Sequence, residues 1–182
     1  NTDAQIRHHS QFSDMRELIE YVLVSFAKHA PTDSHIVIKN HPLDIGWMNY
    51  PKIIADCEKR FDLAGRVHYL EEGGWAMLGS NARGVVTVNS TAGTVALEYG
   101  VPLKALSDPI YNLLGLTCQL PLDDFWREGT PPNVEPFKRF RRCVLHATQV
   151  NGGFYSDEAI ALAVQNSIPV LTAEQSPLER LL

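Results

Sequence analysis

The segment at residues 84–100 constrains the fold of this chain more than any other stretch. It begins with a β-branched apolar run at 85–88, which predicts a buried parallel strand. The polar residues at 89–91 follow, and they favour a turn and the start of a helix. Residues 92–99 can continue as that helix, with Gly100 suited to its C-terminal end. The segment therefore predicts a strand, a polar turn and a helix.

Such a turn places backbone N–H groups, hydroxyls and the positive end of a helix dipole at the carboxyl end of a strand. Phosphates bind to this arrangement. The helix terminus contributes only about 0.3–1 kcal/mol per charge at an exposed site, so it can orient a phosphate but cannot hold a nucleotide alone. The alternative is that Ser90 or Thr91 only caps the helix.

Strand and helix patterns alternate through the first part of the chain. Further strands are predicted at 35–39, 67–70 and 102–106, and a helix that Ser13 caps is predicted to end before Pro31. Two more helices are predicted at 51–61 and 75–82. This alternation predicts an α/β fold, a parallel Rossmann-like sheet with helices on both faces. Ligands bind at the carboxyl ends of the strands in such sheets.

Several polar and basic residues follow the predicted strands at this edge. Pro42 restricts His41 to an extended backbone, so His41 is held at the end of the strand that contains Lys39. A lone histidine is more often a packed or exposed structural residue, but its position beside Lys39 favours an anion ligand. The predicted anion site combines the tips of two strands: Lys39, His41, Asn89, Ser90 and Thr91.

Composition and missing motifs exclude several classes of protein. The net charge of −5 argues against a general nucleic-acid binder. The three cysteines have no metal-ligand spacing and indicate free thiols in a reducing compartment. No apolar run approaches a membrane span or a signal peptide, and the chain begins without Met, which suggests a fragment. The dinucleotide, P-loop and nucleophile-elbow motifs are absent.

The C-terminal third has a different pattern. A helix at 137–147 carries a basic face made by Lys138, Arg139, Arg141 and Arg142. This face is either solvated or in contact with anionic lipid headgroups. A Gly-rich loop at 149–155 and a helix at 157–166 follow.

Motifs spread over residues 1–155 resemble the capsular polysaccharide biosynthesis and export family, of the KpsS/LipB type. They are Asp3-Ala4-Gln5-Ile6, Ser25-Phe26-Ala27 with Ala30-Pro31, Lys39-Asn40-His41-Pro42-Leu43-Asp44, Val88-Asn89-Ser90-Thr91-Ala92-Gly93, Gly100-Val101-Pro102-Leu103-Lys104, Ile110-Tyr111 with Gly115-Leu116-Thr117, Phe125-Trp126 and Asn151-Gly152-Gly153-Phe154-Tyr155.

This resemblance implies a β-Kdo glycosyltransferase of the two-lobed GT-B type, which takes Kdo from the donor CMP-Kdo. Residues 1–155 would be its C-terminal, donor-binding lobe, starting just past the first strand of that lobe, and 156–182 a helix and tail. The N-terminal lobe is then missing, so we expect the chain alone to be inactive. Donor and product are both β-linked, so the family implies retention, through a carboxylate nucleophile or an internal-return route.

The resemblance also implies roles for individual residues. His41 and Asp3 are the candidate catalytic residues, with Asp3 as a candidate nucleophile. Neither a cofactor nor a metal is expected. The residues expected to bind the nucleotide and its phosphate are Lys39, His41, Asn89, Ser90, Thr91, Gly93 and Glu98, the last at the ribose.

The expected partners are a nucleotide sugar, a lipid or lipid-linked saccharide acceptor and the missing N-terminal lobe, with capsule export machinery as a further candidate and no nucleic acid. The expected location is the cytoplasm, peripheral at the inner-membrane face. A different reading is a non-catalytic binding or assembly module of capsule biosynthesis and export. A sugar-nucleotide epimerase would need a second set of carboxylate and histidine residues, which the sequence does not offer.

Overall fold

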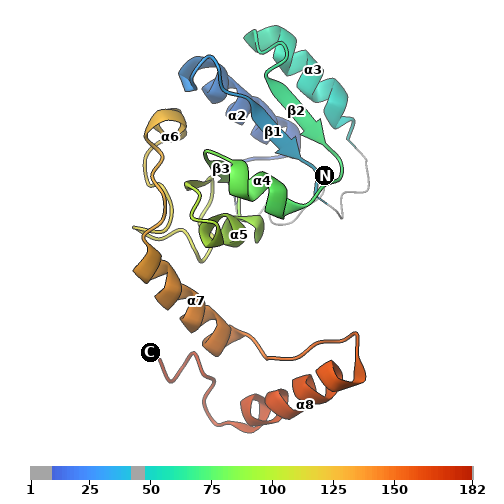
Figure 1. The fold of residues 1–182 in the computed structure, drawn as a ribbon, viewed down its shortest axis with the longest axis vertical. Helices are drawn as coiled ribbons and strands as arrows, with labels where there is room; N and C mark the ends of the chain where they lie inside the picture. Colours follow the sequence, from blue (N-terminus) through green and yellow to red (C-terminus); the bar gives the residue numbers. More distant parts are fainter. Residues whose placement is uncertain (1–9, 42–47, 182) are drawn as a thin grey trace. The chain divides into compact units, whose positions relative to one another are not determined.

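The structure is a computed structural model that describes residues 10–41 and 48–181. Helices and parallel strands alternate along its first compact unit, which ends at Asn133 (Figure 1). This confirms the predicted α/β fold class. The elements of this unit are α2 (Met15–His29), β1 (Ile36–Lys39), α3 (Tyr50–Phe61), β2 (Val67–Leu70), α4 (Trp75–Asn81), β3 (Val85–Thr87), α5 (Ala92–Glu98), β4 (Leu103–Ala105) and α6 (Leu122–Glu128).

Helix α2 begins one residue later than the sequence predicts. Its N-cap is Asp14, whose Oδ1 accepts a hydrogen bond from the N–H of Glu17 at 2.9 Å, so the prediction of Ser13 as the cap is wrong. Ser13 instead donates from its N–H and its hydroxyl to Glu17 Oε2, each at 2.7 Å. These two bonds lower the pKa of the Glu17 carboxyl. The carboxylates of Asp14 and Glu17 therefore each accept a hydrogen bond from a backbone N–H group at the start of α2.

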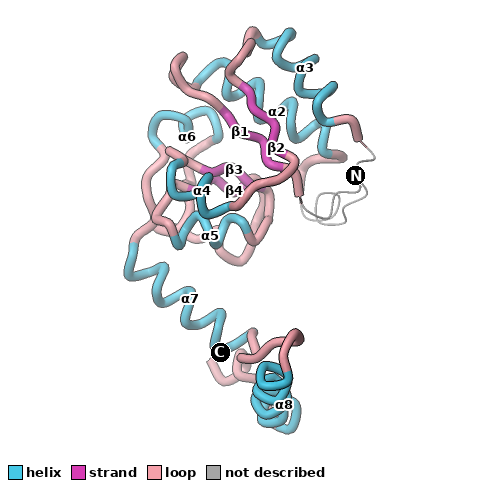
Figure 2. The backbone as a smooth tube through the Cα atoms, turned by 45° about the vertical axis from the view of Figure 1, so that its right-hand side comes forward, coloured by secondary structure: helices cyan, strands magenta, loops and turns pink. Residues whose placement is uncertain are grey.

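The described strands pair in two separate parallel sheets. Strand β1 pairs with β2, with Ile36 opposite Val67, and β3 pairs with β4, with Val85 opposite Leu103. Among the described residues no strand joins β1 to β3. Figure 2 shows the two pairs as separate strand segments within this unit.

Helix α3 packs against β2, and α5 packs against β3 and β4. Helices α2 and α3 pack against each other, and so do α4 and α5, while α6 packs against α2. The largest buried cluster is formed by α2, α3, β1 and β2, and its fully buried members are Leu23, Cys57 and Leu63. Helix α5 ends at Glu98, one residue earlier than predicted, with Tyr99 as its C-cap. Gly100 follows with a φ of 68°, and the N–H of Val101 donates to the carbonyl of Ala96, so glycine closes the helix end as expected.

The second compact unit comprises residues 134–182 and contains α7 (Val134–Thr148) and α8 (Asp157–Thr172). Both helices are longer than predicted, and neither has a buried residue. The boundary between the two compact units thus lies after Asn133. The domain expected from the sequence motifs continues to Tyr155. No helix in the described part of the chain is both long and apolar enough to cross a membrane.

Candidate functional site

One cavity of about 1070 Å³ in the first unit brings together the predicted strand-tip residues. It is lined by residues from α2, β1, α3, β2, α4, β3, α5 and α6. Its lining includes both tips that the sequence singles out: Lys39 and His41 after β1, and Asn89, Ser90 and Thr91 after β3. The lining of the cavity therefore includes cationic and hydroxyl side chains from the tips of two separate strands.

The tip of β1 is fixed by its pairing with β2. The N–H of Asn40 donates to the carbonyl of Leu70 at 2.8 Å, which continues the ladder one residue beyond the strand. Lys39 is half-buried, and its Nζ donates to the carbonyl of Asn40 at 3.2 Å. His41 is exposed. The β1 tip thus presents one positive charge and one imidazole beside the cavity.

The tip of β3 is a compact turn whose backbone N–H groups donate to acceptors within the turn itself. Ser90 Oγ accepts from the N–H of Ala92 at 3.2 Å, and the Ser90 carbonyl accepts from the N–H of Gly93 at 2.9 Å. The N–H of Thr94 donates to the carbonyl of Thr91 at 3.0 Å. The first N–H groups of α5 therefore already have partners within the chain, unlike the open helix start that the sequence suggests. Side chains, with the exposed Thr91 among them, are what this tip offers a ligand.

Tyr111 holds the β3 tip in place. Its hydroxyl donates to the carbonyl of Ser90 at 2.6 Å, and its ring lies against Gly93. Burial raises the pKa of Tyr111 to about 12, so the phenol stays protonated and keeps donating at neutral pH. The sequence contains Tyr111 within a recognisable motif, but nothing in it indicates the bond to Ser90.

Two predicted residues do not line this cavity, and a third lies outside the described residues. Gly93 is buried against Tyr111. Glu98 is exposed at the end of α5 and is not part of the lining. Asp3 lies outside the described residues. Their predicted roles in ribose binding, phosphate binding and catalysis remain predictions.

The charges around the cavity favour an anion at the strand tips. Of the described residues that line it, Asp33 alone carries a carboxylate, and it precedes β1 at the opposite end from Lys39. No group of three or more His, Cys, Asp or Glu side chains suited to a metal ion occurs among the described residues. Among the described lining residues, Lys39 offers a positive charge to a phosphate at the tips. The same residues include no carboxylate near the tips that could act in catalysis.

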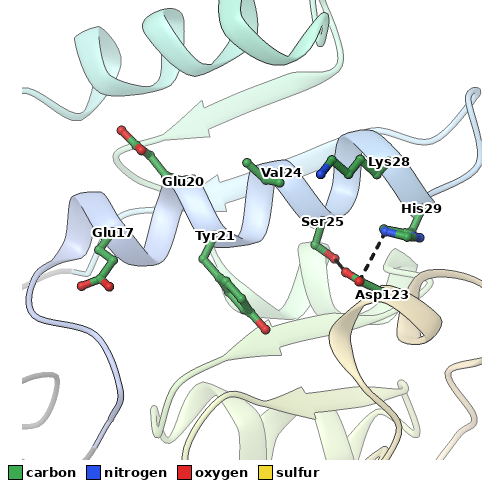
Figure 3. Close-up of a pocket in the computed structure, with 8 residues that line it drawn as sticks. All are labelled: Glu17, Glu20, Tyr21, Val24, Ser25, Lys28, His29 and Asp123. Atoms are coloured by element: carbon green, nitrogen blue, oxygen red, sulfur yellow. Dashed lines mark hydrogen bonds and ion pairs between the residues drawn. The ribbon is translucent and has the colours of Figure 1, made fainter.

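A second, smaller pocket of about 440 Å³ lies between α2 and α6 (Figure 3). Ser25 Oγ donates to Asp123 Oδ1 at 2.5 Å, and His29 Nε2 lies 3.3 Å from Asp123 Oδ2. The indole N–H of Trp126 donates to Ser25 Oγ at 2.8 Å. The carboxylate stands between serine and histidine, so the histidine does not receive the serine proton as it would in a catalytic triad. This group joins two helices, a role that the separate Ser-Phe-Ala and Phe-Trp motifs do not reveal.

Comparison with known proteins shows which family the sequence matches. Residues 1–155 match a family described as capsule polysaccharide biosynthesis protein. The capsule polysaccharide export protein KpsS of Escherichia coli is 40% identical over 153 residues, which cover 84% of this chain and 39% of KpsS. The capsule polysaccharide modification protein LipB of Neisseria meningitidis serogroup A is 40% identical over 155 residues, covering 85% of this chain and 37% of LipB. This chain thus spans less than half the length of these relatives, and no solved structure matches it.

Proposed function

The chain belongs to the family of capsule polysaccharide biosynthesis proteins, and we propose that its strand-tip cavity binds the donor nucleotide sugar of a capsule glycosyltransferase. The donor is CMP-Kdo, and the chain forms the donor-binding lobe of a GT-B-type enzyme that builds a lipid-linked Kdo linker. The observation that carries this proposal is that two strand tips line one cavity with Lys39, His41 and Ser90.

The chemistry of the transfer fits these side chains. When the bond between the sugar and the phosphate breaks, CMP leaves as an anion, and the site has to stabilise the growing negative charge. Lys39 and His41 are positioned at the β1 tip to donate to the phosphate, and the Thr91 hydroxyl is exposed at the β3 tip. Charge-assisted hydrogen bonds of this kind are about twice as strong as neutral ones.

The remaining catalytic groups belong to the longer protein in this proposal. Asp3 is the candidate carboxylate on this chain, and the acceptor, a lipid or lipid-linked saccharide, binds on the other lobe. We therefore expect the 182-residue chain alone not to transfer Kdo. Measurable transfer by the isolated chain would contradict this part of the proposal.

The name of the Escherichia coli relative favours a second candidate, a non-catalytic module that assembles with capsule export machinery. Both candidates use the same fold. They differ in whether the strand tips have to bind a nucleotide, so nucleotide binding separates them.

Titration calorimetry with CMP, UDP and ADP tests the proposal, on this chain and on the longer protein. We expect CMP to bind more tightly than UDP and ADP, and His41→Ala or Ser90→Ala to weaken CMP binding about tenfold or more, because each change removes a phosphate donor.

Two exposed residues outside the cavity lining provide matched controls. His68→Ala on β2 and Ser80→Ala on α4 remove the same side-chain types away from the strand tips. We expect both to leave CMP binding unchanged. Absence of CMP binding in the longer protein, or unchanged binding by both His41→Ala and Ser90→Ala, would favour the assembly role. Equal loss in all four variants would contradict binding at the strand tips.

A further inference from the structure

The strand tips account for only one end of a nucleotide. A nucleotide carries an anionic phosphate at one end and a flat aromatic base at the other. Lys39 and Ser90 line the cavity at the tips proposed to hold the phosphate, whereas the predicted ribose contact, Glu98, is not part of the lining. An aromatic side chain beside the tips would give the base a surface on which to stack.

Most of the aromatic side chains in the cavity already pack against one another. The described lining contains six Phe, Tyr and Trp residues. Five of them form ring pairs, with centroid distances of 5.2 Å for Phe26 and Trp126, 5.9 Å for Phe125 and Trp126, and 6.1 Å for Tyr50 and Tyr69. The sixth, Trp75, forms no ring pair with another described residue. Trp75 is therefore the lining aromatic whose ring is open to a ligand.

Trp75 lies close to the tip of β1 because of the way α4 follows β2. Lys39 pairs with Leu70 at the ends of β1 and β2, and residues 71–74 join Leu70 to the first residue of α4, Trp75. Figure 1 shows the chain passing from the end of β2 into α4. Helix α4 then leads to the start of β3 at Val85. The first turn of α4, with Trp75, is therefore its end nearer the β1 tip.

The indole ring is held against α4 but is not covered. Trp75 and Leu78 are three residues apart, share one helix face and both line the cavity. A β-carbon at Gly79 would stand 3.2 Å from Cε3 of Trp75 and 3.2 Å from Cδ2 of Tyr99, so the absence of a side chain at position 79 lets an edge of the indole pack onto the helix. Trp75 as a whole is half-buried. A ring fixed in this way loses little conformational freedom when a ligand stacks on it.

We propose that Trp75 is the platform on which the base of the donor nucleotide stacks while the strand tips hold its phosphate. This inference rests on the proposed function, because it assigns a second contact of the same nucleotide. Stacking is tolerant of base identity, since every base has an aromatic face. Trp75 thus adds affinity for nucleotides in general, and a preference for cytosine has to come from other contacts.

Titration calorimetry with CMP, UMP and ribose 5-phosphate separates the base from the phosphate, on this chain and on the longer protein. We expect Trp75→Ala to weaken the binding of CMP and of UMP about tenfold, which is within the range for one base on one aromatic ring. Ribose 5-phosphate lacks a base, so its binding should not change. Trp75→Phe keeps an aromatic face and should retain most of the affinity for CMP.

Tyr21→Ala is the matched control for the loss of an aromatic ring. Tyr21 is a partly exposed residue of α2 outside the lining of this cavity, and its ring lies 5.4 Å from that of Phe12. We expect this change to leave CMP binding unaltered. Equal losses of CMP and ribose 5-phosphate binding in Trp75→Ala, or an equal loss of CMP binding in Tyr21→Ala, would mean that the change acts through the fold and would overturn the proposal.

Tryptophan fluorescence gives a readout that a purely structural role of Trp75 would not produce. A base stacked on an indole quenches its emission, so we expect CMP to quench the fluorescence of the unmodified protein and of Trp126→Phe. Ribose 5-phosphate should have no such effect. In Trp75→Phe the quenching should disappear although calorimetry still detects CMP binding. Quenching that persists in Trp75→Phe would contradict stacking on Trp75.

The inference and the proposed function fail in different ways. CMP binding that His41→Ala weakens and Trp75→Ala leaves unchanged would support the phosphate site and overturn the base platform. Absence of CMP binding in both the chain and the longer protein would overturn both.

Discussion

Gly93 lies where the turn after β3 meets the ring of Tyr111. A β-carbon at position 93 would stand 2.6 Å from the Tyr111 hydroxyl oxygen and 2.7 Å from the adjacent ring carbon. The same hydroxyl is bonded to the Ser90 carbonyl, so Tyr111 cannot move away without breaking that bond. The requirement for glycine at this position therefore comes from packing beneath the candidate phosphate site.

Replacing Gly93 with alanine should destabilise the protein through this overlap. We expect Gly93→Ala to lower the free energy of unfolding by about 1–3 kcal/mol, the usual cost of overpacking, as measured by urea denaturation. Gly74→Ala is the control, because a β-carbon there meets nothing within 4 Å. Its φ of −74° suits any residue, so its effect should stay within about 0.5 kcal/mol. Similar effects of both changes would contradict the packing argument.

The residues at the strand tips could be predicted, but their local partners could not. The positions of Lys39, Ser90 and Thr91 follow from strand patterns that a short sequence window contains. The bond from Tyr111 to Ser90 joins residues 21 apart, through a loop without regular periodicity. Roles that depend on such contacts, as for Gly93, are therefore not available from sequence pattern alone.

At the scale of elements, the group of Ser25, His29 and Asp123 fastens α6 to α2. Ser25 is buried, accepts from Trp126 and donates to Asp123, so each polar atom of this contact has a partner. A second bond, from Arg127 Nε to the carbonyl of His29 at 2.8 Å, joins the same two helices. Loss of the carboxylate would leave the buried Ser25 hydroxyl without its acceptor.

We expect Asp123→Ala to lower the free energy of unfolding by about 1–3 kcal/mol, the cost of an unsatisfied buried polar group, as measured by urea denaturation. Asp124→Ala is a matched control, because Asp124 is an exposed acid in the same first turn of α6. It reproduces any change in the charge near the helix start while leaving the contact with Ser25 intact. Equal losses would assign the effect to that charge and contradict the role of the contact.

Element prediction succeeded where periodicity and caps agreed. Strand β2 matches its predicted range of 67–70, and β1 and α3 each differ by one residue at one end. Helix α6 was not predicted, because residues 120–126 mix proline, acids and apolar side chains without a clear period. Its contact with α2 depends on a bond between residues 98 apart, Ser25 and Asp123. Strand spans are local properties, whereas the division of the described strands into two sheets depends on long-range pairing.

At the scale of the whole molecule, the two compact units differ in how they are stabilised. The first contains buried clusters formed by helices and strands. In the second, α7 and α8 contain no buried residue. Several large apolar side chains of α8 are exposed, among them Val164, Ile168 and Leu171. A segment that buries so little cannot offset the conformational entropy that folding removes.

We therefore expect the isolated segment 134–182 to lack cooperative unfolding. Helices of this length are marginal in water without tertiary packing, so the helical circular dichroism signal should fall gradually on heating. The 182-residue chain provides the comparison, because its buried clusters should give a sigmoidal transition. A sigmoidal transition of the isolated segment, at a midpoint independent of its concentration, would mean that α7 and α8 form a core of their own. A midpoint that rises with concentration would instead indicate that the exposed side chains of α8 are buried by self-association.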